Sequence, residues 1–376
     1  MDFSEIIGQD KIKQRLMQTI KEDRVQQALL LCGDEGVGKL ALALAYASKL
    51  LTKGTPSMPV NVSNAEAMIR KWEHPDLHFV YPIIRLDKMK ADYKATSDDF
   101  ARPWHEMVCK SPYFSFTQWM EAMGTTNKQA TITTAESDSL TRKLSLKSSM
   151  GGYKVVIIWK PERAHEVFSN KILKLLEEPP KHTVFLLISQ EPEALLETIR
   201  SRTQRIDVPH IDEQTILQAL MDKRGLETDD AARIAHMAHG SWLHALEFIS
   251  ADNERGEFLQ QFASLMRLCY ARNLKGLKTW CDTIAAMGRE KEIRMLTYFM
   301  QQVRENFIYN FHQPELNFQT KEEDAFSSKF ARFINEKNVI EINELFQQTQ
   351  QDIEGNAKEK IVLFDMALQL IVLLLR

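Results

Sequence analysis

The chain has 376 residues, an apolar fraction of 44%, a charged fraction of 26% and a formal net charge of −3. This length suggests two or three domains, and the charge excludes a protein that binds nucleic acid through bulk positive charge. The sequence contains four cysteines and no Cys-x-x-Cys pair, which argues against a zinc ribbon or a disulfide framework. Because the first residues also lack an apolar signal core, we expect a cytoplasmic protein.

Four short apolar runs predict strands at residues 28–32, 77–81, 154–159 and 183–188, and residues 40–51 form a strongly helical stretch after the first run. Continuous apolar strands alternating with helices predict a parallel sheet covered on both faces. The segment from about residue 84 to residue 150 is polar and aromatic, and we interpret it as an insertion of helices and loops with its own small core.

The pattern changes after Pro209. Residues 211–249 indicate short helices, and from about residue 253 to the end the apolar residues recur at helical spacing, with a loop expected at 311–321. The apolar run at 361–375 is too short to cross a bilayer and carries Asp365 and Gln369, so we expect a buried helix and no membrane partner. These shifts divide the chain into residues 1–208, 209–252 and 253–376.

A phosphate-binding loop is indicated between the first strand and the first long helix. Gly33, Gly36, Gly38 and Lys39 fit the pattern G-x-x-x-x-G-K. Glycines let backbone N–H groups turn toward phosphate oxygens, the helix adds its positive end, and the lysine would reach the outer phosphates. The alternative is a glycine turn that binds nothing.

The residues that should hold magnesium are missing. The position after Lys39 should carry a hydroxyl but holds Leu40, and the strand at 154–159 ends in Trp159 and Lys160 instead of an acidic pair. Phosphoryl transfer depends on positioning and on charge neutralisation by the metal. We therefore predict no metal site and no ATP hydrolysis by the isolated chain, although the loop could still bind a phosphate or sulfate.

Several motifs then resemble one family. They are the opening FSEIIGQ at 3–9, His74-Pro75-Asp76, the segment KILKLLEEPP at 171–180, and Ser201-Arg202-Thr203, where the family usually has Ser-Arg-Cys. In this order after a phosphate loop, they resemble the AAA+ clamp-loader subunits of bacterial DNA polymerase III. The broken phosphate site resembles the delta-prime family among these subunits.

The resemblance implies an α/β AAA+ domain with a parallel sheet at 1–208, a small helical lid domain at 209–252 and an all-α collar domain at 253–376. It implies a rigid end subunit in a pentameric ATPase that loads the sliding clamp on primed DNA, with gamma/tau and delta subunits as partners. In that assembly Arg202 would act as an arginine finger on a neighbour's ATP.

Two positions depart from the family pattern. Leu243 stands where a second-sensor arginine is expected, and residues 52–73 lack the cysteines of the usual zinc module, so we expect no zinc or other cofactor.

Other functions remain open from the sequence. One is an active ATPase subunit of the gamma/tau type, another a DNA-associated scaffold built on a relic fold, and a third a small-molecule kinase. A basic cluster of Arg142, Lys143 and Lys147 could face DNA or solvent. Ser189, at the first-sensor position, could contact a γ-phosphate or simply end its strand.

Overall fold

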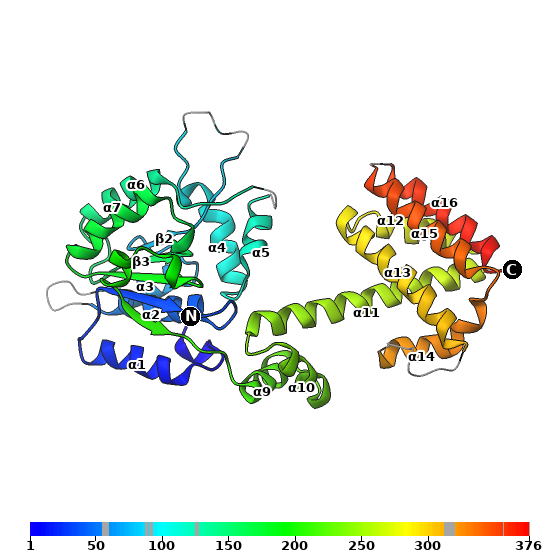
Figure 1. Cartoon of the computed structure of the whole chain (residues 1–376), viewed down its shortest axis with the longest axis horizontal. Helices are drawn as coiled ribbons and strands as arrows, with labels where there is room; N and C mark the ends of the chain where they lie inside the picture. The colour runs from blue at the N-terminus through cyan, green and yellow to red at the C-terminus, as the bar shows by residue number, and fades with distance from the viewer. Residues whose placement is uncertain are drawn as a thin grey trace. The chain divides into compact units, whose positions relative to one another are not determined.

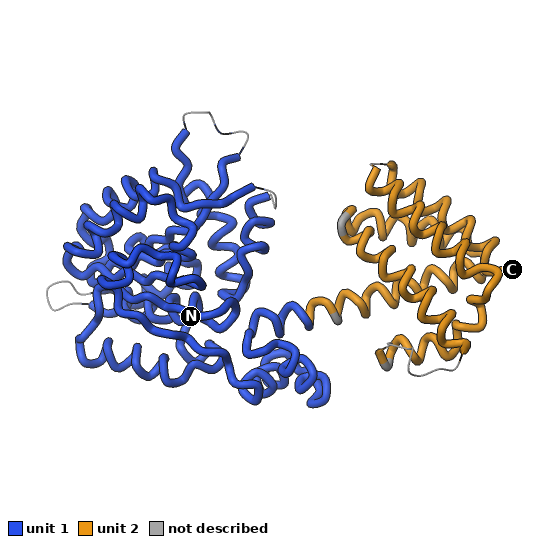
Figure 2. Tube along the Cα trace, in the orientation of Figure 1, with its two compact units in different colours: residues 1–248 blue, residues 249–376 orange. Residues whose placement is uncertain are grey.

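The structure, a computed structural model, describes residues 1–54, 60–86, 89, 93–124, 128–311, 320–355 and 357–375. The chain divides into two compact units, residues 1–248 and residues 249–376 (Figure 2). Within the described residues, no helix combines the length and the apolar character needed to cross a membrane.

Five parallel strands form the centre of the first unit (Figure 1). They are β1 (Ala28–Cys32), β2 (Leu77–Val80), β3 (Lys154–Trp159), β4 (Thr183–Ser189) and β5 (Gln204–Asp207), in the order β2-β3-β4-β1-β5. The four predicted strands are confirmed, and β1, β3 and β4 are buried along their whole length. The sequence pattern missed β5 because this edge strand buries only Ile206 and has no apolar run.

Helices cover both faces of this sheet. Those of the first unit are α1 (Asp10–Lys21), α2 (Lys39–Thr52), α3 (Val62–Ile69), α4 (Ala101–Lys110), α5 (Phe116–Ala122), α6 (Thr134–Ser145), α7 (Glu166–Glu177), α8 (Glu197–Arg200), α9 (Glu213–Arg224) and α10 (Thr228–Met237). Phe168 and Ile172 of α7 and Ile199 of α8 pack on β1, β3 and β4. Figure 1 shows α1 and α2 on the opposite side of the sheet from α6 and α7. The expected α/β class is confirmed.

The insertion at 84–150 is helical with loops, as expected, and contains α4, α5 and α6. The expectation of a core of its own holds only in part, because Trp104 contacts Trp119 and Phe114 but the same cluster continues onto the sheet. Trp104 of α4 stacks on Tyr81, which follows β2, with ring centroids 4.0 Å apart, and lies 5.4 Å from Trp159 at the end of β3. Leu140 and Leu144 of α6 join the core under the sheet. The aromatic side chains bury their surface against the sheet, which offers a larger apolar surface than a short insertion can supply alone.

The described residues of the second unit form helices joined by turns, with no strand among them, which confirms the prediction for the chain from about residue 253. Its helices are α12 (Leu274–Ile284), α13 (Arg289–Tyr309), α14 (Lys321–Phe330), α15 (Val339–Glu354) and α16 (Glu359–Leu373), together with the later part of α11 (Trp242–Tyr270). Helix α11 has 29 residues and runs without interruption through residue 252, so the expectation of only short helices at 211–249 is wrong. The expected loop at 311–321 lies largely outside the described residues.

The apolar tail is buried on one face only. In α16, Leu363, Met366 and Leu370 lie in the helical core, whereas Ile361 and Val372 are exposed. The prediction of a buried helix is therefore correct for one side of α16. A helix that packs against α12 and α15 still leaves its outer side uncovered within the described chain.

Candidate functional site

The predicted phosphate loop has the backbone that its sequence suggests. It connects β1 to α2, and Gly33, Gly36 and Gly38 have φ values of 146°, 80° and 99°. These positive values favour glycine, and Gly38 caps the N-terminus of α2. The loop therefore lies at the carboxyl end of a parallel strand, where open α/β sheets bind ligands.

The lysine of this loop is folded back onto the loop itself. The Nζ atom of Lys39 donates to the backbone oxygens of Gly33 and Asp34. The residue is only 6% exposed. Burial, and then the nearby charge of Lys160, lower the pKa of the Lys39 amine to about 8. Two of the three donors of the ammonium are thus used within the chain.

The segment that opens α11 closes one side of the loop. The Ser241 hydroxyl donates to the Glu35 backbone oxygen at 3.0 Å, and the Trp242 N–H donates to the Gly36 oxygen at 3.1 Å. A Cβ atom on Gly36 would lie 2.7 Å from the Cβ of Leu243. Leu243, the residue at the second-sensor position, therefore packs directly on the loop and brings no charge to it.

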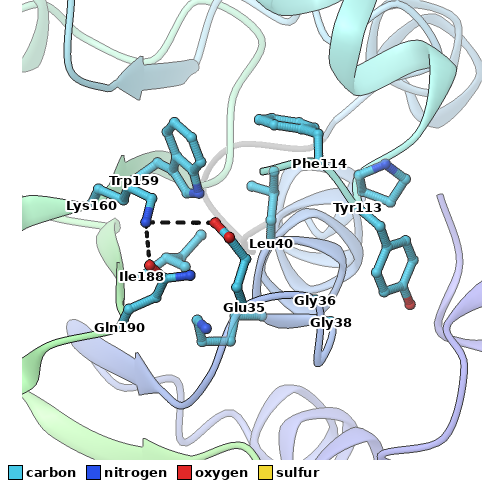
Figure 3. A pocket seen from close by; sticks show the side chains of 12 residues that line it. Glu35, Gly36, Gly38, Leu40, Tyr113, Phe114, Trp159, Lys160, Ile188 and Gln190 are labelled. Carbon is cyan, nitrogen blue, oxygen red and sulfur yellow. Dashed lines mark hydrogen bonds and ion pairs between the residues drawn. The ribbon is translucent and has the colours of Figure 1, made fainter. Parts of the chain in front are cut away.

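Bulky side chains fill the other side of the loop, where a metal would be expected. Leu40, Phe114, Trp159 and Lys160 are among the residues that line a cavity of about 30 Å³ (Figure 3). A single buried water needs roughly 10–15 Å³ of such volume, so this cavity has room for about two or three waters. The three residues at the positions where metal ligands are expected are buried: Leu40 and Trp159 are 6% exposed and Lys160 is 5% exposed.

The insertion supplies much of this filling. The ring of Phe114 lies 5.4 Å from that of Trp159, and Phe116 lies 6.2 Å from it. The hydroxyl of Tyr113 accepts a hydrogen bond from the Ile7 N–H at 3.3 Å. Our sequence reasoning did not identify these residues as part of the site. The aromatic run at 113–119 is a signal of a buried surface, but it does not say which surface is covered.

The carboxylate of Glu35 reaches the site, but it is already paired with other groups of the chain. Glu35 Oε1 lies 3.7 Å from Lys160 Nζ and accepts from the Phe116 N–H at 3.3 Å. The same ammonium also donates to Gln190 Oε1. Burial lowers the pKa of Lys160, and Glu35 is the largest influence in the opposite direction. The positive charge of Lys160 is thus held beside the loop by groups of the chain itself.

The remaining sequence candidates lie outside this cavity. Ser189 ends β4 and is fully buried, and its hydroxyl has no hydrogen-bond partner among the described residues. Lys143 forms an ion pair with Asp98 at 2.7 Å. Across the described part of the chain, no group of three or more His, Cys, Asp or Glu is placed to hold a metal ion.

Arg202 lies in the turn between α8 and β5, about one third exposed, and does not line the loop cavity. Its Nη2 atom is 2.7 Å from Glu177 Oε1, and its Nη1 donates to the Thr198 backbone oxygen at 3.0 Å. Thr203, the residue that replaces the family's usual cysteine, donates its hydroxyl to the oxygens of Ile199 and Arg200, both at 3.1 Å. The guanidinium is therefore held at the surface of a turn that is itself well anchored.

Comparisons with known proteins indicate the family of the chain. The family model described as "DNA polymerase III, delta subunit" matches residues 8–212, a range that includes both the phosphate loop and Arg202. Two similar proteins, named DNA polymerase III subunit delta', come from Haemophilus influenzae and Bacillus subtilis. They are 26% and 24% identical to this chain over 253 and 260 residues. These alignments cover 67% and 69% of the chain but only 64% of the length of each relative.

A DNA polymerase III subunit gamma/tau from Mycobacterium tuberculosis is also similar. It is 24% identical over 236 residues, which is 61% of this chain and 33% of that protein. The similarity to subunits of one assembly therefore includes two subunit types.

Proposed function

Because the chain belongs to the DNA polymerase III delta-subunit family, we propose that it is a non-hydrolysing, delta-prime-like subunit of the clamp loader. Its partners would be gamma/tau-type and delta-type subunits in the cytoplasm and, through the assembly, the sliding clamp and primed DNA. In this role the chain is a rigid end subunit that supplies Arg202 to the ATP site of a neighbouring subunit.

The observation that carries the proposal is the filled phosphate loop. Ligand pockets for small molecules usually have volumes of roughly 300–1,000 Å³, whereas the cavity beside Lys39 has about 30 Å³. Leu40 offers no metal ligand, and Lys160 places a cation near the position that a metal would take. These features support a subunit that does not hydrolyse ATP itself.

Arg202 supports the second half of the proposal. A partly exposed guanidinium on an anchored turn is able to reach a group on another chain, because its charge is at the surface and its backbone is fixed. An arginine supplied in trans is worth about 10³–10⁵ in rate in GTPases, since it stabilises charge on the transferring phosphate.

The alternative of an active gamma/tau-type ATPase fits the same fold and a similar relative. It requires a metal and space for a triphosphate, and the packing of Leu40, Trp159 and Phe114 argues against both. A DNA-associated scaffold outside the clamp loader is distinguished by its partners: a tagged chain that captures no gamma/tau-type or delta-type subunit would contradict our proposal.

The arginine finger is tested in the assembly reconstituted from this chain and the other clamp-loader subunits. We expect Arg202→Ala to leave assembly intact and to abolish DNA-stimulated turnover at the ATP site that Arg202 reaches. Arg205→Ala is a matched control, because Arg205 is an exposed arginine three residues further along that pairs with Asp207 and Glu193. Unchanged turnover in Arg202→Ala would refute the finger role.

A second measurement tests the chain alone. We expect no magnesium-dependent ATP turnover by the isolated protein. Turnover that disappears in Lys39→Ala would show that the loop is an active site and would favour the gamma/tau-type alternative.

A further inference from the structure

The guanidinium of Arg202 is fixed by two contacts on two different nitrogens. Glu177 Oε1 lies 2.7 Å from Nη2, and the Thr198 backbone oxygen accepts from Nη1 at 3.0 Å. One contact alone would leave the planar group free to turn about that bond. Two contacts on separate nitrogens define the orientation of the plane, because the group is rigid.

Both anchors belong to parts of the chain that are themselves fixed. Glu177 is the last residue of α7, which buries Phe168 and Ile172 in the core under the sheet. Helix α7 ends there because prolines follow Glu178 and cannot continue it. Thr198 lies in α8, which contacts α7. The carboxylate of Glu177 is therefore presented from a rigid base, although its side chain is half exposed.

The contacts leave Arg202 with donors to spare. A guanidinium carries five N–H donors, and a phosphate is recognised best by two parallel ones. Glu177 and Thr198 use one donor each, and the Ser201 hydroxyl adds a long contact of 3.5 Å to Nη1. The pairing with Glu177 thus orients the guanidinium and leaves some of its N–H donors available to a phosphate.

The next residue along provides a natural comparison. Glu178 carries the same charge and is also exposed, yet within the described residues its carboxylate has no hydrogen bond or ion pair. Of these two adjacent carboxylates, that of Glu177 contacts Arg202 and that of Glu178 does not.

We propose that Glu177 is a positioning residue for Arg202: its carboxylate holds the guanidinium in the orientation in which it meets a neighbouring subunit's ATP. This inference rests on the proposed function, in which Arg202 acts in trans. Glu177 itself touches no reacting atom and acts only through the arginine. The alternative, in which the ion pair holds Arg202 away from its target, predicts the opposite effect on rate.

The test measures kcat and KM for ATP in the reconstituted, DNA-stimulated assembly. We expect Glu177→Ala to lower kcat by about threefold to fivefold, the scale of a partly exposed ion pair. KM should change by less than about twofold, because the lost interaction belongs to the transition state. Glu177→Gln keeps an acceptor oxygen and should restore most of kcat, while Glu178→Ala should match the unmodified protein. Thermal melting and gel filtration verify folding and assembly.

A double variant identifies the route of the effect. If Glu177 acts through Arg202, then Glu177→Ala should have no further effect in an Arg202→Ala background. An additional loss there would overturn the positioning role. A higher kcat in Glu177→Ala would also overturn it. So would equal kcat values for Glu177→Ala and Glu178→Ala in an assembly where Arg202→Ala is impaired. Neither result would contradict the role of Arg202 as an arginine finger. If Arg202→Ala is unimpaired, the proposed function and this inference both fail.

Discussion

The buried amine of Lys39 predicts a specific dependence of stability on pH. Burial and Lys160 lower its pKa from 10.5 to about 8 in the folded chain. Between these two values the unfolded chain binds more protons than the folded chain, so the free energy of unfolding rises with pH through this window. Below about pH 8 the free energy of unfolding is reduced by the full cost of burying the charged Lys39 amine, and above about pH 10.5 this reduction is absent.

The size of the effect follows from the shift. A difference of 10.5 − 8 = 2.5 units corresponds to about 3 kcal/mol, at about 1.36 kcal/mol per unit. Most of this, about 2–3 kcal/mol, should develop between about pH 7 and pH 10. Lys39→Met removes the titrating group, so the stability of the unmodified protein relative to this variant should increase by that amount over this range.

The assay is denaturant unfolding followed by tryptophan fluorescence at a series of pH values. Lys49→Met is the matched control, since Lys49 lies on the same helix but is 45% exposed and pairs with Asp2. It separates the effect of burial from the loss of one positive charge. A difference between the unmodified protein and Lys39→Met that stays constant with pH would refute our view that the amine is held away from solvent and anions.

The same experiment tests whether the loop still binds an anion. A phosphate or sulfate beside Lys39 would favour the charged amine and raise its pKa. If added phosphate flattens the pH profile of the unmodified protein but not that of Lys39→Met, the loop retains an anion site.

Three further substitutions test the packing of the first unit, each through the denaturant midpoint. Gly36→Ala should destabilise the protein by about 2 kcal/mol or more, because its Cβ would lie 2.0 Å from the Ser241 hydroxyl oxygen. Gly124→Ala is the control for the backbone contribution, since Gly124 has a similar φ of 84° and its Cβ would meet no atom within 4 Å. Equal losses of stability in the two variants would contradict the contact with Ser241. Trp159→Ala should cost about 3–5 kcal/mol as a truncation of a buried aromatic, and a loss below about 1 kcal/mol would mean that its surroundings collapse to fill the space. Asp76→Ala should cost about 1–3 kcal/mol, because its carboxylate accepts three hydrogen bonds from residues 148–150; an unchanged midpoint would show that water replaces it.

The sequence predicts the centre of the fold better than its edges. The strands at 28–32, 154–159 and 183–189 are buried on both faces, so they are continuous apolar runs that a reader can recognise. Gln204–Asp207 is a strand because β1 lies beside it, and its own residues carry little of that signal. Helix α11 likewise extends past the expected domain boundary, because helical periodicity does not mark where one unit ends.

For the candidate site, the sequence identifies the loop but not what fills it. The spacing of Gly33, Gly38 and Lys39 is local, and the loss of a hydroxyl at Leu40 can be read directly. The contact between Trp159 and Phe114 joins positions 45 residues apart (159 − 114 = 45), and it depends on how the insertion folds over the sheet. The pairing of Arg202 with Glu177 similarly requires the packing of α7 against α8.

The first part of the insertion, residues 84–130, starts and ends at nearly the same point. The Ile83 N–H donates to the Thr131 oxygen, and the Thr131 N–H donates to the Ile83 oxygen, both at 3.0 Å. Residue 132 then continues alongside Ala164. A segment whose two ends already meet can be gained, exchanged or lost in one genetic event without re-threading the strands on either side. Because that segment carries Tyr113 and Phe114, such an event would also change the side chains that line the cavity beside the loop.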